Sequence, residues 1–170
     1  MLIVGVGGLL RWRSRRPVPP ALPSPTPRPP TTMVTLYYIN RAYVERGDER
    51  LPHLLPEKRR LAPATEGGLA AAAVSALQTA PSSPRAMRVI REDLKVRGVW
   101  VEDGVAYVDF ARTNLFGGSL EEILMVQGTV KTLTGLPGIT SVRFLVEGRP
   151  AETLMGHVAV DQPLKPEDVF

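Results

Sequence analysis

Apolar and polar positions alternate on both sides of an Asp-Gly pair in the stretch VWVEDGVAYVDF (99–110). The pair at 103–104 predicts a two-residue hairpin, because a type I′ turn needs positive φ at both central positions. Pairing outward from this turn places Trp100 opposite Tyr107 on one face of the ribbon. The other face is aliphatic and is expected to receive the helices; it consists of Val99, Val101, Ala106, Val108 and Phe110.

The residues before this hairpin do not follow the same alternation. Strict alternation places Leu94 and Val96 on the Trp100 side of the ribbon, away from the expected core. A bulge at 97–98 would return them to the aliphatic face, because one extra residue reverses the alternation. The sequence therefore predicts an irregularity at this position.

Two segments have the composition and spacing of helices. The first, EGGLAAAAVSALQTAP (66–81), is rich in alanine and ends at a proline. The second lies within 114–138, where Ser119 and Glu122 match a capping box and Gly135 is the expected stop. Its predicted apolar face runs through Leu120, Ile123, Val126 or Gln127, Val130 and Leu133.

The remaining apolar runs are short and rich in β-branched residues. VTLYYI (34–39) and SVRFLVEG (141–148) alternate in the manner of strands. Residues 50–62 contain two prolines, which cannot donate to a sheet ladder, so an edge strand or an irregular crossing is predicted there. We expect a turn or loop over 40–49, a connector over 81–93, and a short edge strand with a tail over 154–170.

This order of elements is typical of an α+β fold. We expect a two-layer sandwich in which an antiparallel or mixed β-sheet carries two helices on one face, formed by a single domain over residues 34–166. The chain has 170 residues, which is long enough to bury a core without covalent cross-links. It has no cysteine, so disulfides, thiolate chemistry and Cys-ligated metals are excluded.

The first 33 residues differ from the body in charge. They carry five arginines and no acidic residue, whereas residues 34–170 hold 16 basic and 17 acidic side chains. The net charge is therefore +5 for the tail and −1 for the body. Because the positive charge belongs to the tail, no nucleic-acid partner is expected for the body.

Two interpretations of this tail remain open. It is either a disordered Arg/Pro-rich tail, or the remnant of a membrane anchor followed by a proline-rich linker. Such a linker would hold the body roughly 50 Å from the anchor. The apolar run MLIVGVGGLL has ten residues, whereas a membrane span needs about 20. The arginines that follow it favour a cytoplasmic flank.

No pattern in the sequence predicts a catalytic, cofactor-binding or metal site. The two histidines, His53 and His157, are too far apart in sequence to suggest the closely placed ligands of a zinc site. Neither the serines nor the pair Gly117-Gly118 lies in a nucleophile-elbow or P-loop context. The cluster Lys58, Arg59 and Arg60 is either a solvated loop or a contact for an anionic polymer.

Trp100 and Tyr107 form the candidate binding surface, together with Leu145 from the outward side of the last predicted strand. Exposed apolar patches often mark contact sites. The alternative is that residues 50–62 or the C-terminal tail cover them. Asp109 is a candidate structural anchor beside the loop that contains Asn114, because a carboxylate there can accept backbone N–H groups and hold that loop.

The body resembles the GerMN domain, the module named for GerM-type sporulation and spore-germination proteins. The resemblance covers 34 to about 166 and is carried by VTLYYI, by the alanine-rich helix ending ALQTAP, and by GVWVEDGVAYVDFA. It continues through EEILMVQGTVKTLTGLPGITSVRFLVEGRP and the closing segment GHVAVDQPLKPEDV. The chain departs from the usual pattern at 80–81, where Ala-Pro replaces Gly-Pro, and it lacks a lipoprotein cysteine.

The resemblance implies a small α/β domain of extracytoplasmic bacterial proteins, often tethered as lipoproteins or behind a membrane anchor. Such domains are similar to the ring-building modules of envelope complexes and are treated as non-catalytic binding or assembly modules. The expected partner is therefore an envelope protein, a cell-wall component or a second copy, with membrane proximity through the N-terminal segment. The alternative is a soluble intracellular adaptor whose basic tail contacts nucleic acid or anionic lipid.

Overall fold

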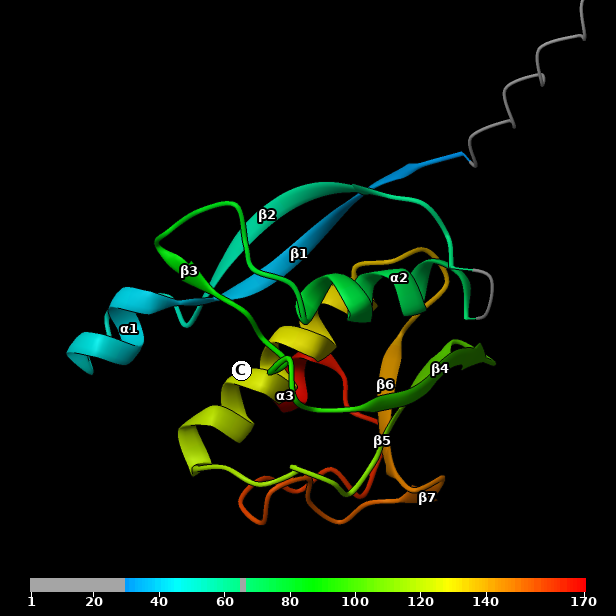
Figure 1. Cartoon of the computed structure of the whole chain (residues 1–170). Coiled ribbons are helices and arrows are strands. Elements are labelled where there is room, and N and C mark those ends of the chain that lie inside the picture. The colour runs from blue at the N-terminus through cyan, green and yellow to red at the C-terminus, as the bar shows by residue number, and fades with distance from the viewer. Residues whose placement is uncertain (1–29, 65–66) are drawn as a thin grey trace, which may run out of the picture.

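The computed structural model describes residues 30–64 and 67–170. The two interpretations of the tail, residues 1–33, therefore lie outside the described residues except at positions 30–33. The elements follow one another along the chain as Figure 1 shows. They are β1 (Thr32–Asn40), α1 (Arg41–Arg46), β2 (Leu54–Leu61), α2 (Gly68–Leu77), β3 (Ala86–Met87), β4 (Val96–Glu102), β5 (Val105–Phe110), α3 (Ser119–Thr134), β6 (Ser141–Val146), β7 (Arg149–Pro150) and the 3₁₀ helix η1 (Pro166–Asp168).

The fold is α+β, as predicted, but its strands form two sheets rather than one. The first sheet has the order β2-β1-β3, and the second has the order β4-β5-β6-β7, in which β5 and β6 run parallel. The helices α2 and α3 lie between the two sheets and contact both of them (Figure 1). They therefore do not cover one face of a single sheet.

On this side of β1 the short strand β3 pairs only with Ile39 and Asn40, because α3 occupies the edge at Tyr37. The backbone N–H of Tyr37 donates to the Thr132 hydroxyl at 3.0 Å, where a further strand would otherwise accept it. Gly128 allows the close approach: a Cβ at that position would lie 3.1 Å from the carbonyl oxygen of Tyr37. A helix thus satisfies the sheet edge that a strand would otherwise pair.

The predicted hairpin is confirmed. Trp100 pairs with Tyr107, and the register shifts between Val96 and Gly98, where the bulge was expected. On the aliphatic face the β5 residues are fully buried, as is Leu94 before the bulge. The prediction is wrong for Val101, whose side chain is 44% exposed. That residue lies near the hairpin end of an edge strand, beyond the part of β4 that faces α2.

The predicted face of α3 is correct in its second half and wrong at its start. Val126, Val130 and Leu133 are buried, but Leu120 and Ile123 are 40% and 36% exposed. Because α3 lies between two sheets, most of its circumference is buried from Leu124 onward, and only its start exposes apolar side chains of the predicted face. The capping box is also wrong, since Gly118 is the N-cap residue and no side chain caps this end.

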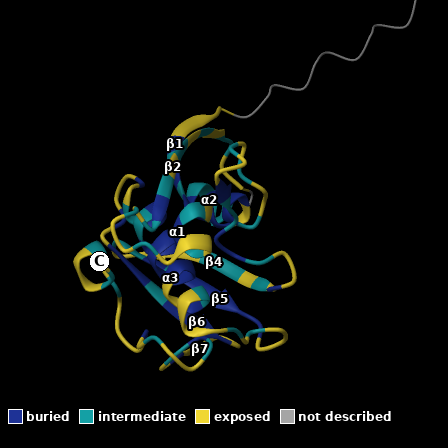
Figure 2. Ribbon diagram, turned by 90° about the vertical axis from the view of Figure 1, so that its left-hand side faces the viewer, coloured by how far each residue is buried: buried dark blue, intermediate teal, exposed yellow. Residues whose placement is uncertain are grey.

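The segment 40–49 forms a short helix, α1, where a loop was expected. Asn40 accepts the N–H of Ala42 through its side chain, and Gly47 ends the helix with φ of 61°. By contrast, the edge-strand prediction for 50–62 is confirmed by β2. Figure 2 shows the result: buried residues gather where α2, α3 and the two sheets meet, and the outer loops are exposed.

Candidate functional site: the aromatic face of the β4–β5 hairpin

Trp100 and Tyr107 lie on the outer face of the hairpin, where the sequence places them. Their ring centroids are 5.2 Å apart and their planes differ by 5°, so the rings are stacked. The turn that sets this register has φ of 48° at Asp103 and 79° at Gly104. The indole remains 39% exposed, so the pair is a stabilised but accessible aromatic feature.

The bulge beside this pair shapes the surface under the indole. A Cβ at Gly98 would lie 3.7 Å from the Trp100 ring, so the indole sits close over the backbone of β4 at this position. The bulged residue Arg97 projects toward the next strands, with its Nη1 atom 3.2 Å from Asp109 and 3.3 Å from Glu147. The aromatic pair is thus bordered by a guanidinium group fixed between two carboxylates.

Asp109 is a structural anchor, but it holds a different loop from the one expected. Its Oδ1 atom accepts the backbone N–H of Gly148 at 2.9 Å, in the tight turn between β6 and β7. Glu147 precedes that glycine with φ of 54° and accepts the N–H of Arg112 at 2.9 Å. The carboxylate of Asp109 therefore secures the β6–β7 turn, and Glu147 secures the start of the loop that follows β5.

The structure does not bring the other two candidate residues into the aromatic surface or onto Asp109. Leu145 is 6% exposed, so it adds almost no accessible area beside Trp100. Asn114 is exposed, has φ of 62°, and its carbonyl oxygen accepts from the Arg91 guanidinium at 2.7 Å. It links its own loop to the segment before β4 rather than to Asp109.

Sequence reasoning missed the most fully buried acidic residue of the described chain, Glu122. Its Oε1 atom accepts the backbone N–H groups of Leu154 and Met155 at 2.8 and 2.9 Å. Its Oε2 atom accepts the N–H of His157 at 2.8 Å. The carboxylate therefore fixes the segment after β7 to the start of α3. The signal in the sequence, a glutamate three residues after a serine, was interpreted as a local cap.

The two histidines lie in separate places. His53 contacts the Gln127 side-chain oxygen at 2.9 Å and packs on Tyr43, whereas His157 reaches the Gly117 carbonyl at 3.1 Å. Within residues 30–64 and 67–170, no group of three or more acidic residues, histidines or cysteines could hold a metal ion. These contacts give each histidine a structural role.

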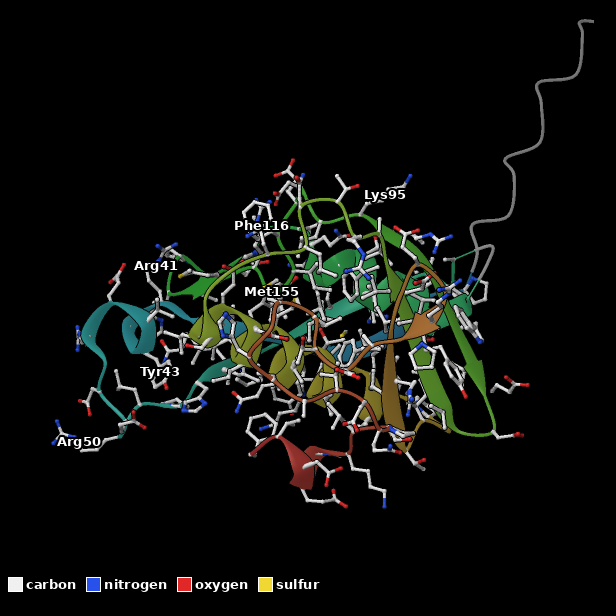
Figure 3. The ribbon with its side chains drawn as sticks, turned by 90° about the horizontal axis from the view of Figure 1, so that it is seen from below. Arg41, Tyr43, Arg50, Lys95, Phe116 and Met155 are labelled. Carbon is white, nitrogen blue, oxygen red and sulfur yellow. The ribbon has the colours of Figure 1, made fainter. Side chains whose placement is uncertain are left out.

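The basic cluster of β2 is divided between the surface and an acidic partner. Lys58 and Arg60 are exposed, whereas Arg59 pairs with Glu57. Partial burial acts to raise the pKa of Glu57, but hydrogen bonds from Arg59 and Ser82 outweigh it and hold the pKa below its ordinary value. Arg50, four residues before β2, points away from the body on the side of the molecule opposite the β4–β5 hairpin (Figure 3).

None of the helices in the part of the chain that the structure describes has the length and apolar character needed to cross a bilayer. No curated protein matches the sequence. A family model described as sporulation and spore germination matches residues 35–152.

Solved structures share the fold. The first GerMN domain of the sporulation protein GerM from Bacillus subtilis superposes with a TM-score of 0.62 at 22% identity, covering 81% of this chain and all of that one. The tandem GerMN domains of the same protein give 0.61 at 20% identity, covering 82% of this chain and 48% of that one. A Clostridium perfringens protein provisionally assigned as a lipoprotein gives 0.56 at 18% identity, covering 82% and 90%. Since the family model matches well over half of its residues, the chain belongs to the sporulation and spore germination family and folds as a GerMN domain.

Proposed function

We propose that this GerMN domain is a non-catalytic binding or assembly module of the bacterial cell envelope. It contacts an envelope protein, a cell-wall component or another copy of itself through the outer face of the β4–β5 hairpin. The observation that carries the proposal is the accessible stack of Trp100 on Tyr107 beside the fixed guanidinium of Arg97. Tryptophan, tyrosine and arginine are the residue types that dominate binding energy at protein interfaces.

The acidic groups near this face support a binding role over a catalytic one. Asp109 and Glu147 each accept a backbone N–H and share the Arg97 guanidinium, so their oxygens are engaged in holding turns. A general acid or base needs a group that can reach a substrate proton. These contacts favour a preorganised contact surface, whose low mobility reduces the entropy lost on binding.

The proposed location is extracytoplasmic, with the body held near a membrane by the N-terminal segment. The family match to sporulation and spore germination proteins supports this placement, as does the shared fold with the clostridial protein. No cofactor is proposed.

A site-specific crosslink tests the binding role. A photoreactive amino acid at position 102, which is exposed and lies on the same face of β4 as Trp100, should capture a discrete partner in cells that carry the full chain. The matched control is the same group at position 50, whose side chain is 89% exposed on the far side of the body. Trp100→Ala should reduce the yield at 102 at least fivefold. Equal yields at both positions, or no adduct at 102, would refute the proposal.

Deletion of residues 1–33 tests the adaptor alternative. If the domain works in the envelope, the deletion releases it from the membrane fraction and leaves the affinity of the body for anionic polymers unchanged. If the basic tail is the functional part, affinity for DNA or anionic vesicles disappears with it. The second outcome would replace the envelope role by the adaptor role.

A further inference from the structure

The ribbon formed by β1 and β2 has one face in the core and one face that points away from it. Val34, Leu36 and Tyr38 are buried, and the hydroxyl of Tyr38 donates to the Ala76 carbonyl of α2 at 2.8 Å. Figures 1 and 2 both show the ribbon at the top of the molecule with α2 beneath it. Because side chains alternate along a strand, the residues between these three point away from α2, together with their partners on β2. This outer face consists of Met33, Thr35, Tyr37, Pro56, Lys58 and Arg60.

The outer face carries positive charge. Lys58 and Arg60 are exposed on it, whereas Glu57, the single acidic residue of the two strands, lies opposite a buried leucine on the inner face and is paired there. Lys131 of α3 adds a third cation, because its Nζ atom lies 4.9 Å from the centroid of the Tyr37 ring. None of these three cations forms an ion pair with another residue of the described chain. The face therefore complements an anionic partner.

Exposed apolar side chains accompany these cations. Met33 is exposed at one end of the outer face. At the other end the Nζ atom of Lys131 lies between two aromatic rings, since the exposed ring of Phe170 has its centroid 4.6 Å away, on the side of Lys131 other than Tyr37 or beside it. Apolar side chains that can enter lipid, next to cations that can reach the headgroups, are typical of surfaces that lie in the interface of a bilayer.

We infer that the outer face of β1 and β2 lies on the surface of a membrane that contains anionic phospholipids. The inference specifies how the body meets the membrane near which we propose that it lies, and it does not depend on the hairpin contact. A soluble polyanion would use the cations of this face, but it would gain nothing from an exposed methionine. Lipid uses both kinds of side chain.

The sequence that leads into this face has the same sign of charge. Residues 1–31 precede β1 and carry five arginines and no acidic residue. Like charges repel, so this segment does not complement the basic face, whereas an anionic bilayer attracts both. Each Lys or Arg close to an anionic bilayer strengthens binding by about fivefold, so the three cations of the face contribute roughly a hundredfold.

This orientation leaves the aromatic face of the hairpin open. The helix α2 contacts β1 on the inner side of the first sheet and β4 on the aliphatic side of the hairpin. The outer faces of the two sheets therefore point away from α2 in different directions. A domain that lies on the bilayer through β1 and β2 can still present Trp100 and Tyr107 to a partner.

Fluorescent labels at two positions test the inference. The chain has no cysteine, so Pro56→Cys introduces one attachment point for an environment-sensitive fluorophore, on the outer face and directly opposite Tyr37. The control is the same label on Glu102→Cys, at an exposed position of the hairpin. The full chain is titrated with phosphatidylcholine vesicles that contain or lack phosphatidylglycerol. On the anionic vesicles the label at 56 should shift to the blue and at least double in intensity, whereas the label at 102 should not respond.

Two pairs of substitutions locate the charge that matters. At the lipid concentration that gives half of the full response, Lys58→Gln combined with Arg60→Gln should reduce the response at 56 at least fivefold. The matched control combines Arg112→Gln with Arg149→Gln, which removes two exposed arginines outside the first sheet, and should change the response less than twofold. All four positions are exposed, so neither pair disturbs the core.

Several outcomes overturn the inference. They are no response at 56, equal responses at 56 and 102, an equal response on vesicles without phosphatidylglycerol, and equal effects of the two pairs of substitutions. A response at 56 to duplex DNA or polyphosphate as large as that to anionic vesicles would make the face a general polyanion site and would also overturn it. If the label at 56 stays silent while the full chain sediments with the vesicles, the outer face is refuted and the proposed location near a membrane is retained.

Discussion

Replacement of Glu122 by glutamine should destabilise the domain strongly, although the two side chains have nearly the same shape. The carboxylate is fully buried and accepts three backbone N–H groups between 2.8 and 2.9 Å. In glutamine one of the two oxygens becomes an NH₂ group. This amide donor then faces a backbone donor, so at least one hydrogen bond is lost and one buried N–H remains without an acceptor.

The magnitude follows from these contacts. A hydrogen bond to a charged group contributes about 1.5–3 kcal/mol, and an unsatisfied buried donor costs about 1–3 kcal/mol. These two contributions overlap in part, and relaxation of the segment after β7 recovers some of the lost free energy. Glu122→Gln should therefore reduce the free energy of unfolding by about 2–4 kcal/mol. Glu122→Ala leaves three orphaned donors and a cavity, and we expect about 3–5 kcal/mol.

Urea unfolding of both variants measures the loss, with Glu121→Gln as the matched control. Glu121 is adjacent on α3 and pairs with Arg91 at a partly exposed site, so its loss should cost less than about 1 kcal/mol. Hydrogen exchange should show reduced protection at residues 154, 155 and 157. A Glu122→Gln midpoint equal to that of the control, with unchanged exchange at these amides, would refute the reasoning.

Three further predictions follow from the described contacts. Gly67→Ala should reduce the free energy of unfolding by at least about 2 kcal/mol, because its φ is 72° and a Cβ would lie 2.0 Å from a carbonyl oxygen of β4. In the control, Gly68→Ala, φ is 56° but no atom lies within 4 Å of the added Cβ, so the loss measured in the same thermal melt should be about 1 kcal/mol. Trp100→Ala should lose the stack on Tyr107, about 0.5–1.5 kcal/mol beyond the loss of buried area, and remove the exciton couplet of the stacked rings in far-UV circular dichroism; an unchanged couplet would contradict the stack. The pKa of Glu57 is lowered in the folded state, so the ionised carboxylate stabilises the fold at pH values above its ordinary pKa of 4.5, and this stabilisation is lost as pH falls through the folded pKa. Glu57→Gln should therefore flatten this part of the curve of unfolding free energy against pH, and an identical pH profile for the two proteins would contradict the prediction.

The sequence predicts local features of this fold better than long-range ones. The hairpin register follows from the Asp-Gly pair alone, because turn geometry determines which residues face each other. The bulge at 97–98 follows from alternation. Both are contacts between neighbours in the chain, so a pattern of a few residues contains the necessary information.

Features that depend on distant segments were not predictable in this way. The pair Ser119 and Glu122 has the spacing of a capping box, but the carboxylate is taken up by backbone 32 to 35 residues later. Leu120 belongs to a stripe that is buried further along α3, but it lies in the first turn of the helix, where no part of the core covers it. At the candidate site the sequence places Trp100 and Tyr107 correctly, and the burial of Leu145 depends on tertiary packing.

The contact of α3 with the edge of β1 constrains when the chain can fold during synthesis. Tyr37 receives its hydrogen-bond acceptor from a residue 95 positions later. Until Thr132 has emerged from the ribosome, β1 and β2 form a two-stranded ribbon whose Tyr37 N–H lacks this acceptor, and two-stranded ribbons are marginally stable in water. Early folding of the N-terminal third is therefore disfavoured, and the chain reaches its native state in one late step, after most of it has been released.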